Sequence, residues 1–316
     1  MRKKVLIKGP LLTRSGYGEQ SRFALRSLRS REDLFEIFIQ PLKWGQTSWL
    51  HEMDEERKWI DQTIEKTIAF IQQGGKFDMS LQITIPNEWQ KLAPVNIGYT
   101  AGIETSKVAP IWLQKGNENV DKIITISSHS MNTYKNTVAI AEDTNTGNFV
   151  NYPTKTYENL PSLDLNITTA FNFLSVAQFG PRKNLPNTIK WFVEEFHDED
   201  VGLVLKTNIA KNCVMDRETI LADLKNYLKG FPDRKCTLYL LHGDMTDEEM
   251  HSLYKHEQID AFLALPHGEG FGLPIFEAAY SGLPVVATGW SGHLDFLTDE
   301  QGREHFYNVA FDLQPV

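Results

Sequence analysis

The chain is poor in cysteine and has no long hydrophobic run. Its two cysteines, Cys213 and Cys236, lack the spacing of a metal site, so we expect reduced thiols, although the two could in principle pair. The N-terminal apolar run Val5–Ile7 is too short for a signal peptide, and no stretch approaches transmembrane length. We therefore expect a cytoplasmic protein without a transmembrane segment.

An excess of positive charge is also missing. The chain has 32 Lys and Arg against 41 Asp and Glu, a formal net charge of −9, and the two signs are interspersed. Nucleic-acid backbones require a concentrated positive surface, so we expect no such partner. No His/Cys cluster occurs, and the one Asp-x-Asp, Asp198–Asp200, follows a predicted helix rather than a strand. We therefore predict no bound metal and no cofactor.

Short β-rich runs alternate with longer helical segments along all 316 residues. This alternation is typical of parallel sheets covered by helices on both faces. Strands are expected at Val5–Lys8, Phe35–Gln40, Met79–Ile83, Asn96–Thr100, Lys122–Ser127, Phe171–Ala177, Gly202–Thr207, Thr237–Leu241, Asp260–Leu265 and Pro284–Thr288. Helices are expected at Glu19–Leu28, Glu55–Gln73, Ala109–Asn117, Ser130–Asn136, Asn184–Phe196, Arg217–Leu228, Asp247–Tyr254 and Pro274–Tyr280.

The alternation of strands and helices occurs once in the first half of the chain and again in the second half. It therefore predicts an α/β protein with two Rossmann-like, doubly wound lobes. The segment Ala141–Leu165 is rich in Asn, Thr, Pro and Asp and has weak periodicity, which indicates a linker. We place an N-terminal lobe at residues 1–160 and a C-terminal lobe at residues 161–316. Ligands of such folds bind beyond the carboxyl ends of the strands, so site residues should follow strands directly.

The most informative stretch is Leu265–Ala279, which follows a predicted strand and opens a helix. Its glycines let the backbone approach a ligand closely, Pro274 suits a first helical turn, and helix N–H groups attract anions. Glu269 and Glu277 lie on either side of that helix start with seven residues between them. Carboxylates accept hydrogen bonds from sugar or ribose hydroxyls, whereas a simple dipole-capping role explains one Glu but not two.

The run Glu-Gly-Phe-Gly-Leu-Pro-Ile-Phe-Glu-Ala at 269–278, followed by Ser-Gly-Leu-Pro-Val-Val-Ala-Thr at 281–288, resembles the glutamate–seven–glutamate motif of glycosyltransferase family 4. This retaining family has the GT-B fold of two facing Rossmann-like lobes. The resemblance implies transfer of a sugar from a nucleoside-diphosphate sugar, with retention of configuration and no metal. It implies that Glu277 binds the ribose and that Glu269 contacts the donor sugar. The same loop would contribute His267, Gly270, Phe271, Gly272 and Leu273.

A pair of cations, Arg182 and Lys183, follows the strand Phe171–Ala177 and precedes a helix. Cations at a helix start oppose its dipole, which predicts an anion beside them. The resemblance implies an Arg at the strand end and a Lys five residues later, both on the donor diphosphate. Lys183 matches the Lys, but Gln178 stands at the Arg position. Either Arg182 substitutes for that Arg, or phosphate neutralisation is weaker than is usual in the family. We predict catalytic roles for Glu269, Lys183 and Arg182.

Weaker candidates also follow predicted strands. Gly16 and Gly18 lie where the family has an N-terminal glycine loop, although an ordinary strand-to-helix turn explains them nearly as well. His242 lies where the resemblance implies contact with the nucleotide base. Four side chains are expected to line the cleft, namely Tyr99, Glu104, His129 and Gln178.

Residues 311–316 show no helical pattern, so the C-terminal helix that usually crosses back in the GT-B fold is expected to be missing. An alternative is therefore a catalytically weak GT-B protein that binds a nucleotide sugar or a glycan without turnover. A sugar-nucleotide epimerase would require an acid/base set that we do not find, and an NAD-dependent oxidoreductase would require a dinucleotide fingerprint in the first turn. The donor nucleotide, the sugar and the acceptor (glycan, lipid, small molecule or protein) stay open at this level.

Overall fold

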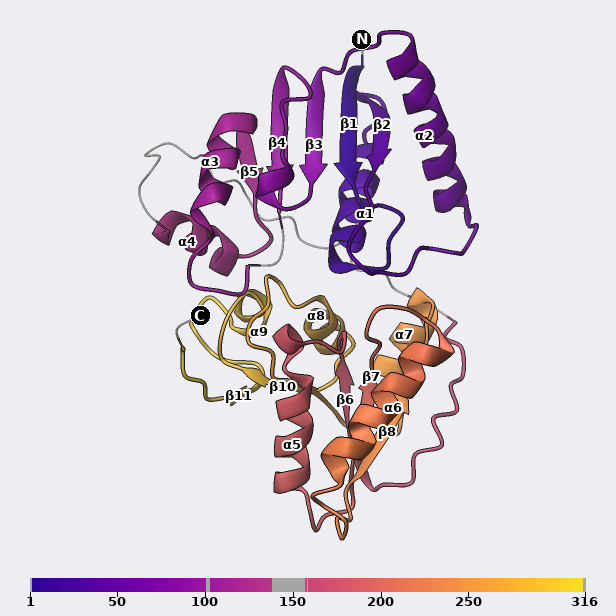
Figure 1. The fold of residues 1–316 in the computed structure, drawn as a ribbon, viewed down its shortest axis with the longest axis vertical. Coiled ribbons are helices and arrows are strands. Elements are labelled where there is room, and N and C mark those ends of the chain that lie inside the picture. The colour runs from indigo at the N-terminus through magenta and orange to yellow at the C-terminus, as the bar shows by residue number, and fades with distance from the viewer. Residues whose placement is uncertain (1, 101–102, 138–156, 158, 315–316) are drawn as a thin grey trace. The chain divides into compact units, whose positions relative to one another are not determined.

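A computed structural model of the chain describes residues 2–100, 103–137, 157 and 159–314. The chain divides into two compact units, Met1–Thr154 and Lys155–Val316. Figure 1 shows that each unit contains one sheet with helices packed against it. Most of the predicted linker lies outside the described residues. Among the described residues, no helix combines the length and the apolar composition needed to cross a bilayer.

The first unit contains a five-stranded sheet in the order β2-β1-β3-β4-β5, and all neighbouring strands are parallel. In register, Val5 of β1 lies opposite Ile37 of β2 and Met79 of β3. The strands are β1 (Lys3–Gly9), β2 (Phe35–Pro41), β3 (Met79–Ile83), β4 (Val95–Tyr99) and β5 (Lys122–Ile124). The helices are α1 (Gly16–Arg29), α2 (Glu55–Gln72), the short 3-10 turn η1 (Pro86–Glu88), α3 (Pro110–Asn119) and α4 (Ser128–Asn136).

The second unit contains a six-stranded parallel sheet in the order β11-β10-β9-β6-β7-β8. This is the doubly wound Rossmann order: strands β6 to β8 are added toward one edge of the sheet, and strands β9 to β11 toward the other, so the strand order reverses between β6 and β9. The strands are β6 (Phe171–Val176), β7 (Val201–Lys206), β8 (Thr237–Leu241), β9 (Ala261–Ala264), β10 (Val285–Thr288) and β11 (Tyr307–Val309). The helices are η2 (Pro181–Lys183), α5 (Leu185–Glu195), α6 (Val214–Leu228), α7 (Asp247–Tyr254), α8 (Leu273–Tyr280) and α9 (Leu294–Leu297).

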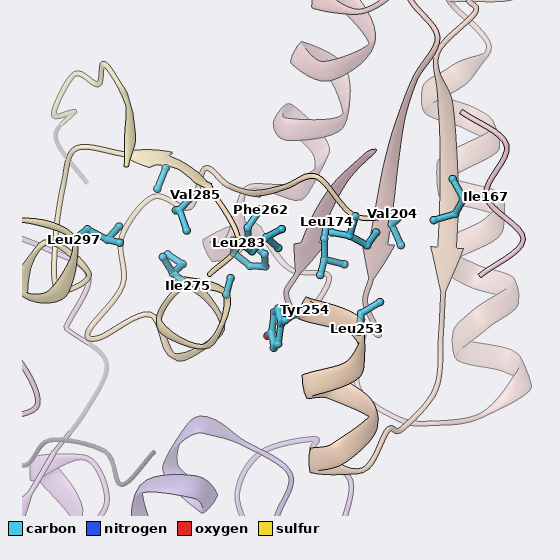
Figure 2. Packing of buried hydrophobic residues seen from close by; sticks show 13 residues of the cluster. Ile167, Leu174, Val204, Leu253, Tyr254, Phe262, Ile275, Leu283, Val285 and Leu297 are labelled. Atoms are coloured by element: carbon cyan, nitrogen blue, oxygen red, sulfur yellow. The ribbon is translucent and has the colours of Figure 1, made fainter. Parts of the chain in front are cut away.

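Helices cover both faces of this second sheet. Leu203 and Leu205 of β7 pack in a cluster with α5 and α6, whereas Val204 between them packs in another cluster with α7 and α8. Successive side chains of a strand point to opposite faces, so an unbroken apolar run fills both layers. Figure 2 shows the second cluster, with Phe262 of β9 and Ile275 of α8 among its members. The prediction of two parallel-sheet, Rossmann-like units is confirmed.

Several element boundaries differ from the prediction for local reasons. Helix α1 begins at Gly16 rather than Glu19 because the Ser15 hydroxyl accepts a hydrogen bond from the Gly18 N–H (3.0 Å) and caps the helix. Strand β5 ends at Ile124 because Ser127 already caps α4. Sequence reasoning missed β11, a three-residue edge strand of largely exposed residues, and residues 310–314 form no helix.

Candidate functional site

The predicted donor-site residues lie beyond the carboxyl ends of β6 and β9, where the second sheet reverses its strand order. Open α/β sheets bind ligands at this position because the loops after the two strands diverge to opposite faces. A small cavity of about 20 Å³ lies between these strand ends, with room for about one water molecule. Lys183 and Glu269 both line it. A larger ligand therefore has to bind on the loops around these residues rather than inside the cavity.

Three predicted site residues meet here. The Lys183 ammonium forms an ion pair with Oε1 of Glu269, and Nη1 of Arg182 lies 3.5 Å from Oε2 of the same carboxylate. The side chains of Glu269 and Lys183 are only 11% and 15% exposed, whereas that of Arg182 is 47% exposed. The anion predicted beside the two cations is thus the Glu269 carboxylate in this structure. Two cations face one carboxylate, so the cluster carries an excess positive charge.

The loop after β10 holds the backbone of Glu269 in place. The Glu269 N–H donates to the Ser291 hydroxyl (2.8 Å), and the Glu269 carbonyl accepts from the Gly292 N–H (2.8 Å). A Cβ on Gly292 would lie 2.0 Å from the Gly270 carbonyl oxygen, so only glycine fits. Ser291 itself has a left-handed φ of 85°, a strained conformation for serine. From the sequence, the segment Trp290–His293, which follows the last predicted strand, is expected to line the wall of the same pocket. The structure adds that Ser291 and Gly292 hold the backbone of Glu269.

His293 lies beneath the same loop and is fully buried. Its Nε2 lies 2.7 Å from the Thr288 carbonyl oxygen, which requires a proton on Nε2. Its Nδ1 has no hydrogen-bond partner among the described residues. Burial lowers the pKa of His293, so the ring is neutral at physiological pH. His293 therefore supports the Glu269 loop without adding to its charge.

The N-terminus of α8 adds hydrogen-bond donors to the cluster. Gly272 caps the helix with φ 88°, and no side chain of the described residues caps its first N–H groups. Such a helix start is a ready anion site. Of the predicted backbone donors, Gly272 and Leu273 lie at this start, while the Phe271 ring packs against Phe276 and Phe296 with centroids 5.5 and 5.0 Å apart.

Two other residues predicted on this loop differ in exposure. Gly270 is buried, in keeping with its close contact to the loop after β10. The His267 side chain is exposed, and the His267 N–H donates to the Arg182 carbonyl oxygen (3.2 Å). That hydrogen bond joins the loop after β9 to the loop after β6, so the backbone of His267 helps to place Arg182.

Glu277 lies one turn into α8, where α8 packs against α7. The hydroxyl of the buried Tyr254 donates to Oε2 of Glu277 (2.9 Å). Burial and the neighbouring carboxylate both raise the pKa of Tyr254, so the phenol stays protonated and remains a donor. This hydrogen bond therefore orients the Glu277 side chain near the same helix start as the cation cluster.

His242 belongs to a separate cluster around Asp216. Its Nε2 lies 3.0 Å from Oδ1 of Asp216, and the two side chains are only 4% and 6% exposed. The expected contact of His242 with a nucleotide base stays a prediction; in this structure the ring is turned onto Asp216. The exposed part of His242 is its backbone.

Asp216 anchors the loop after β7, a role that sequence reasoning missed. Its carboxylate accepts hydrogen bonds from the N–H groups of Ile209, Ala210 and Lys211 at 2.8–2.9 Å. Burial opposes ionisation of this carboxyl, but the backbone hydrogen bonds together outweigh it and lower the pKa to about 2. Gln178 reaches the same loop, since its Nε2 donates to the Ile209 carbonyl oxygen (2.6 Å). Gln178 thus contributes a loop contact in this structure.

We expect Asp216→Asn to lower the free energy of unfolding by about 2–3 kcal/mol at neutral pH, because an amide nitrogen cannot accept N–H bonds. The folded pKa lies below the ordinary value of 3.8, so the carboxylate stabilises the protein above about pH 4 and loses this effect toward about pH 2. Urea denaturation at several pH values measures both effects. Asp198→Asn, on an exposed turn, is the control, and an equal acid dependence of the two variants would contradict the assignment.

The first unit contains five of the predicted site residues. Gly18 is buried, and a Cβ there would lie 2.1 Å from the Thr13 carbonyl oxygen, while Gly16 forms the first residue of α1. Tyr99, which is expected to line the cleft, is 2% exposed in this structure, and its role stays a prediction. Burial raises its pKa, and the adjacent Gln20 side chain partly opposes this shift. Two others are half-buried, Glu104 after β4 and His129 in the first turn of α4.

The described residues contain no group of three or more His, Cys, Asp or Glu side chains arranged to hold a metal ion. Cys213 is exposed and Cys236 is buried, and both are free thiols, as predicted. Asp198–Asp200 lies on an exposed turn after α5, away from the strand ends that carry the cluster.

One segment of the second unit is similar to a known protein family. Residues 234–308 match the family described as "Glycosyl transferases group 1". The matched segment includes Glu269, Glu277 and the loop that holds Glu269, but it does not include Arg182 or Lys183. No curated protein sequence matches the chain significantly.

Solved structures resemble the chain over nearly its whole length. Sucrose-phosphate synthase from Thermosynechococcus elongatus is 13% identical with a TM-score of 0.58, over 94% of this chain and 84% of that one. The catalytic domain of starch synthase IV from Arabidopsis thaliana, bound to ADP and acarbose, is 11% identical with a TM-score of 0.59, over 98% and 88%. Anabaena HepE in complex with UDP-glucose is 14% identical with a TM-score of 0.54, over 95% and 84%. The chain therefore has the GT-B fold of two Rossmann-like units, and a segment of its second unit is similar to the glycosyl transferases group 1 family.

Proposed function

We propose that this protein is a glycosyltransferase that transfers a sugar from a nucleoside-diphosphate sugar held by its second unit. The observation that carries the proposal is the cluster of Arg182, Lys183 and Glu269 beside the N-terminus of α8. This cluster offers two cations and helix N–H groups to a diphosphate and a carboxylate to a sugar. It lies where the Rossmann-like sheet reverses its order, and Glu269 and α8 lie in the segment that matches group 1.

Glu269 has two successive roles in this proposal. Without donor, its carboxylate neutralises Lys183 and Arg182. A donor diphosphate competes for the same two cations, because phosphate oxygens are strong acceptors for Arg and Lys. The displaced carboxylate then accepts hydrogen bonds from hydroxyls of the donor sugar. The backbone hydrogen bonds to Ser291 and Gly292 hold Glu269 at the site during this exchange.

The chemical step breaks the bond between the anomeric carbon of the sugar and the diphosphate oxygen. Negative charge develops on that oxygen, and Lys183, Arg182 and the α8 N–H groups are placed to stabilise it. The acceptor hydroxyl forms the new bond to the anomeric carbon, and its proton goes to the departing phosphate. Retention of configuration and independence of metal belong to the proposal through the resemblance to glycosyltransferase family 4.

The ribose and the base of the donor nucleoside would contact different residues of the second unit. The Glu277 carboxylate, oriented by Tyr254, would accept hydrogen bonds from the ribose hydroxyls. The base would contact the backbone of His242, because the side chain of that residue is held by Asp216. Since the Anabaena neighbour was solved with UDP-glucose, UDP is the first nucleotide to test.

The experiment is calorimetric titration of UDP, GDP and ADP, followed by NMR analysis of the sugar released from the matching nucleotide sugar. We expect one diphosphate to bind, and its nucleotide sugar to be cleaved slowly even by water, in the presence or absence of EDTA. The anomeric form first released tests retention. Binding without any sugar release, with or without added acceptors, would favour a binding protein. No binding of any nucleotide would overturn the proposal.

A further inference from the structure

The residue that follows Lys183 has a left-handed backbone. Asn184 has φ 55° and ψ 23°, and it is only 6% exposed. Most residues avoid this conformation, and asparagine is among the few with a side chain that tolerate it. The Asn184 N–H donates to the Pro181 carbonyl oxygen (3.0 Å), and the Asn184 carbonyl accepts from the Thr188 N–H (2.9 Å). Asn184 therefore joins the end of η2 to the start of α5, and its conformation sets the direction in which the chain leaves Lys183.

The side chain of Asn184 does not cap the helix that it precedes. An asparagine at this position normally accepts a hydrogen bond from a backbone N–H of the first turn, but within the described residues of α5 the Asn184 side chain makes no such bond. Instead, its Nδ2 donates to the carbonyl oxygen of Leu265, the first residue after β9 (3.0 Å). Its Oδ1 accepts from Nδ2 of Asn187 (2.6 Å), which fixes the amide in this orientation. The side chain thus stabilises a contact between two loops rather than its own helix.

Hydrogen bonds on both sides of Lys183 join the loop after β6 to the loop after β9. One runs from Asn184 to Leu265, and the other from the His267 N–H to the Arg182 carbonyl oxygen (3.2 Å). The loop after β9 also carries the carboxylate that pairs with the Lys183 ammonium. A lysine side chain is long and flexible, so the position of its charge depends on how its backbone is held. These two bonds therefore fix where Lys183 starts relative to the carboxylate that it faces.

We propose that Asn184 is a positioning residue for Lys183. Its left-handed backbone turns the chain so that Lys183 faces Glu269 while α5 packs into the core, and its amide joins that turn to the opposite loop. Asn184 is itself buried, so its effect on the reaction acts through Lys183 rather than by contact with the donor. The inference rests on the proposed function, because that function assigns the Lys183 ammonium to the departing diphosphate.

Asn184→Gly isolates the role of the amide, because glycine readily adopts the left-handed backbone but has no side chain. The charge of Lys183 remains, so donor binding should change little, whereas the ammonium is less well aligned with the leaving oxygen. For sugar release from the nucleotide sugar, starting with UDP-glucose, we expect kcat to fall by about 10–100-fold and KM to change by less than about threefold. Asn184→Ala also disfavours the left-handed backbone, so its effect should be larger. NMR time courses at several donor concentrations measure both constants.

The matched control is Asn166, another left-handed asparagine, with φ 49° at an exposed position before β6. Asn166→Gly and Asn166→Ala should leave kcat and KM unchanged, which separates the effect at Asn184 from a general effect of replacing a left-handed asparagine. Tm is measured for every variant to identify misfolding. A wild-type kcat in folded Asn184→Gly would overturn the inference.

Asn187→Ala covers the case in which the Asn184 variants do not fold. It leaves the left-handed residue in place and removes only the side chain that orients the Asn184 amide. Its kcat should fall by a smaller factor than that of Asn184→Gly, with KM unchanged. A wild-type kcat in Asn187→Ala would overturn the role of the amide.

The position of Lys183 can also be measured without turnover. Acetic anhydride labels lysine amines, and mass spectrometry gives the rate at Lys183, which is 15% exposed, relative to the exposed Lys190. Lys183 should be labelled faster in Asn184→Gly and Asn187→Ala than in wild type, because its ammonium is held less firmly against Glu269. Equal labelling rates would overturn this inference alone. Failure of the wild type to bind any nucleoside diphosphate would instead overturn the proposed function.

Discussion

Replacing Lys183 with alanine should slow sugar release from the nucleotide sugar by about 10²–10³-fold, the typical cost of removing one preorganised donor from developing charge. Lys183 is the more buried of the two cations on Glu269, and its ammonium is held by direct contact with that carboxylate. The less buried Arg182 would remain, but a single cation leaves the departing diphosphate incompletely neutralised. Diphosphate affinity should fall along with the rate. Both quantities are measured by NMR time courses and calorimetry.

The control is Lys190→Ala, which removes an exposed lysine of α5 that pairs with Glu194. It should leave rate and affinity unchanged. Lys183→Ala also leaves the largely buried Glu269 with Arg182 alone, so Tm is measured to separate misfolding from lost chemistry. Lys183→Arg restores a charge and should recover part of the rate. A near-normal rate in a folded Lys183→Ala protein would remove Lys183 from the reaction.

The second large effect is expected for Glu277→Gln, which should weaken UDP binding by about 10–100-fold. Hydrogen bonds to a charged group contribute about 1.5–3 kcal/mol, and each 1.4 kcal/mol corresponds to tenfold in affinity. The structure fixes this carboxylate through Tyr254, so its orientation should persist when the charge is removed. The decisive measurement compares UDP with its 2′-deoxy and 3′-deoxy forms. Wild type should discriminate against the deoxy ligands, and Glu277→Gln should lose that discrimination.

The matched control for this series is Glu248→Gln on α7, whose side chain is exposed. Tyr254→Phe provides an intermediate case, because it removes the hydroxyl that orients Glu277 but keeps the carboxylate charge. If Glu277→Gln weakens UDP and the deoxy ligands equally, Glu277 acts on some other part of the nucleotide. The assignment to the ribose would then be wrong.

The local pattern of residues was sufficient for the fold class and most elements. Apolar runs such as Val5–Ile7 mark strands that are buried on both faces, which only helix-covered parallel sheets provide. Helix α7 has the predicted bounds, and the structure shows that Thr246 and Glu249 form a capping box at its start. Lys183, Glu269 and Glu277 were predicted as site residues because glycines, carboxylates and cations follow strands directly. In each case the signal lies within a few neighbouring residues.

The order of the strands in each sheet could not be predicted from the local sequence. The contacts between the site residues follow from that order, so they also required the tertiary structure. Lys183 meets Glu269 across 86 residues because β6 pairs with β9, and no local pattern encodes that pairing. Ser291 and Gly292 hold Glu269 because β10 lies next to β9, and Asp216 binds His242 across 26 residues. Residue periodicity reports which face of an element is buried, whereas strand neighbours follow from packing the whole chain. The residue types of the site were therefore readable from the sequence, but their contacts required the fold.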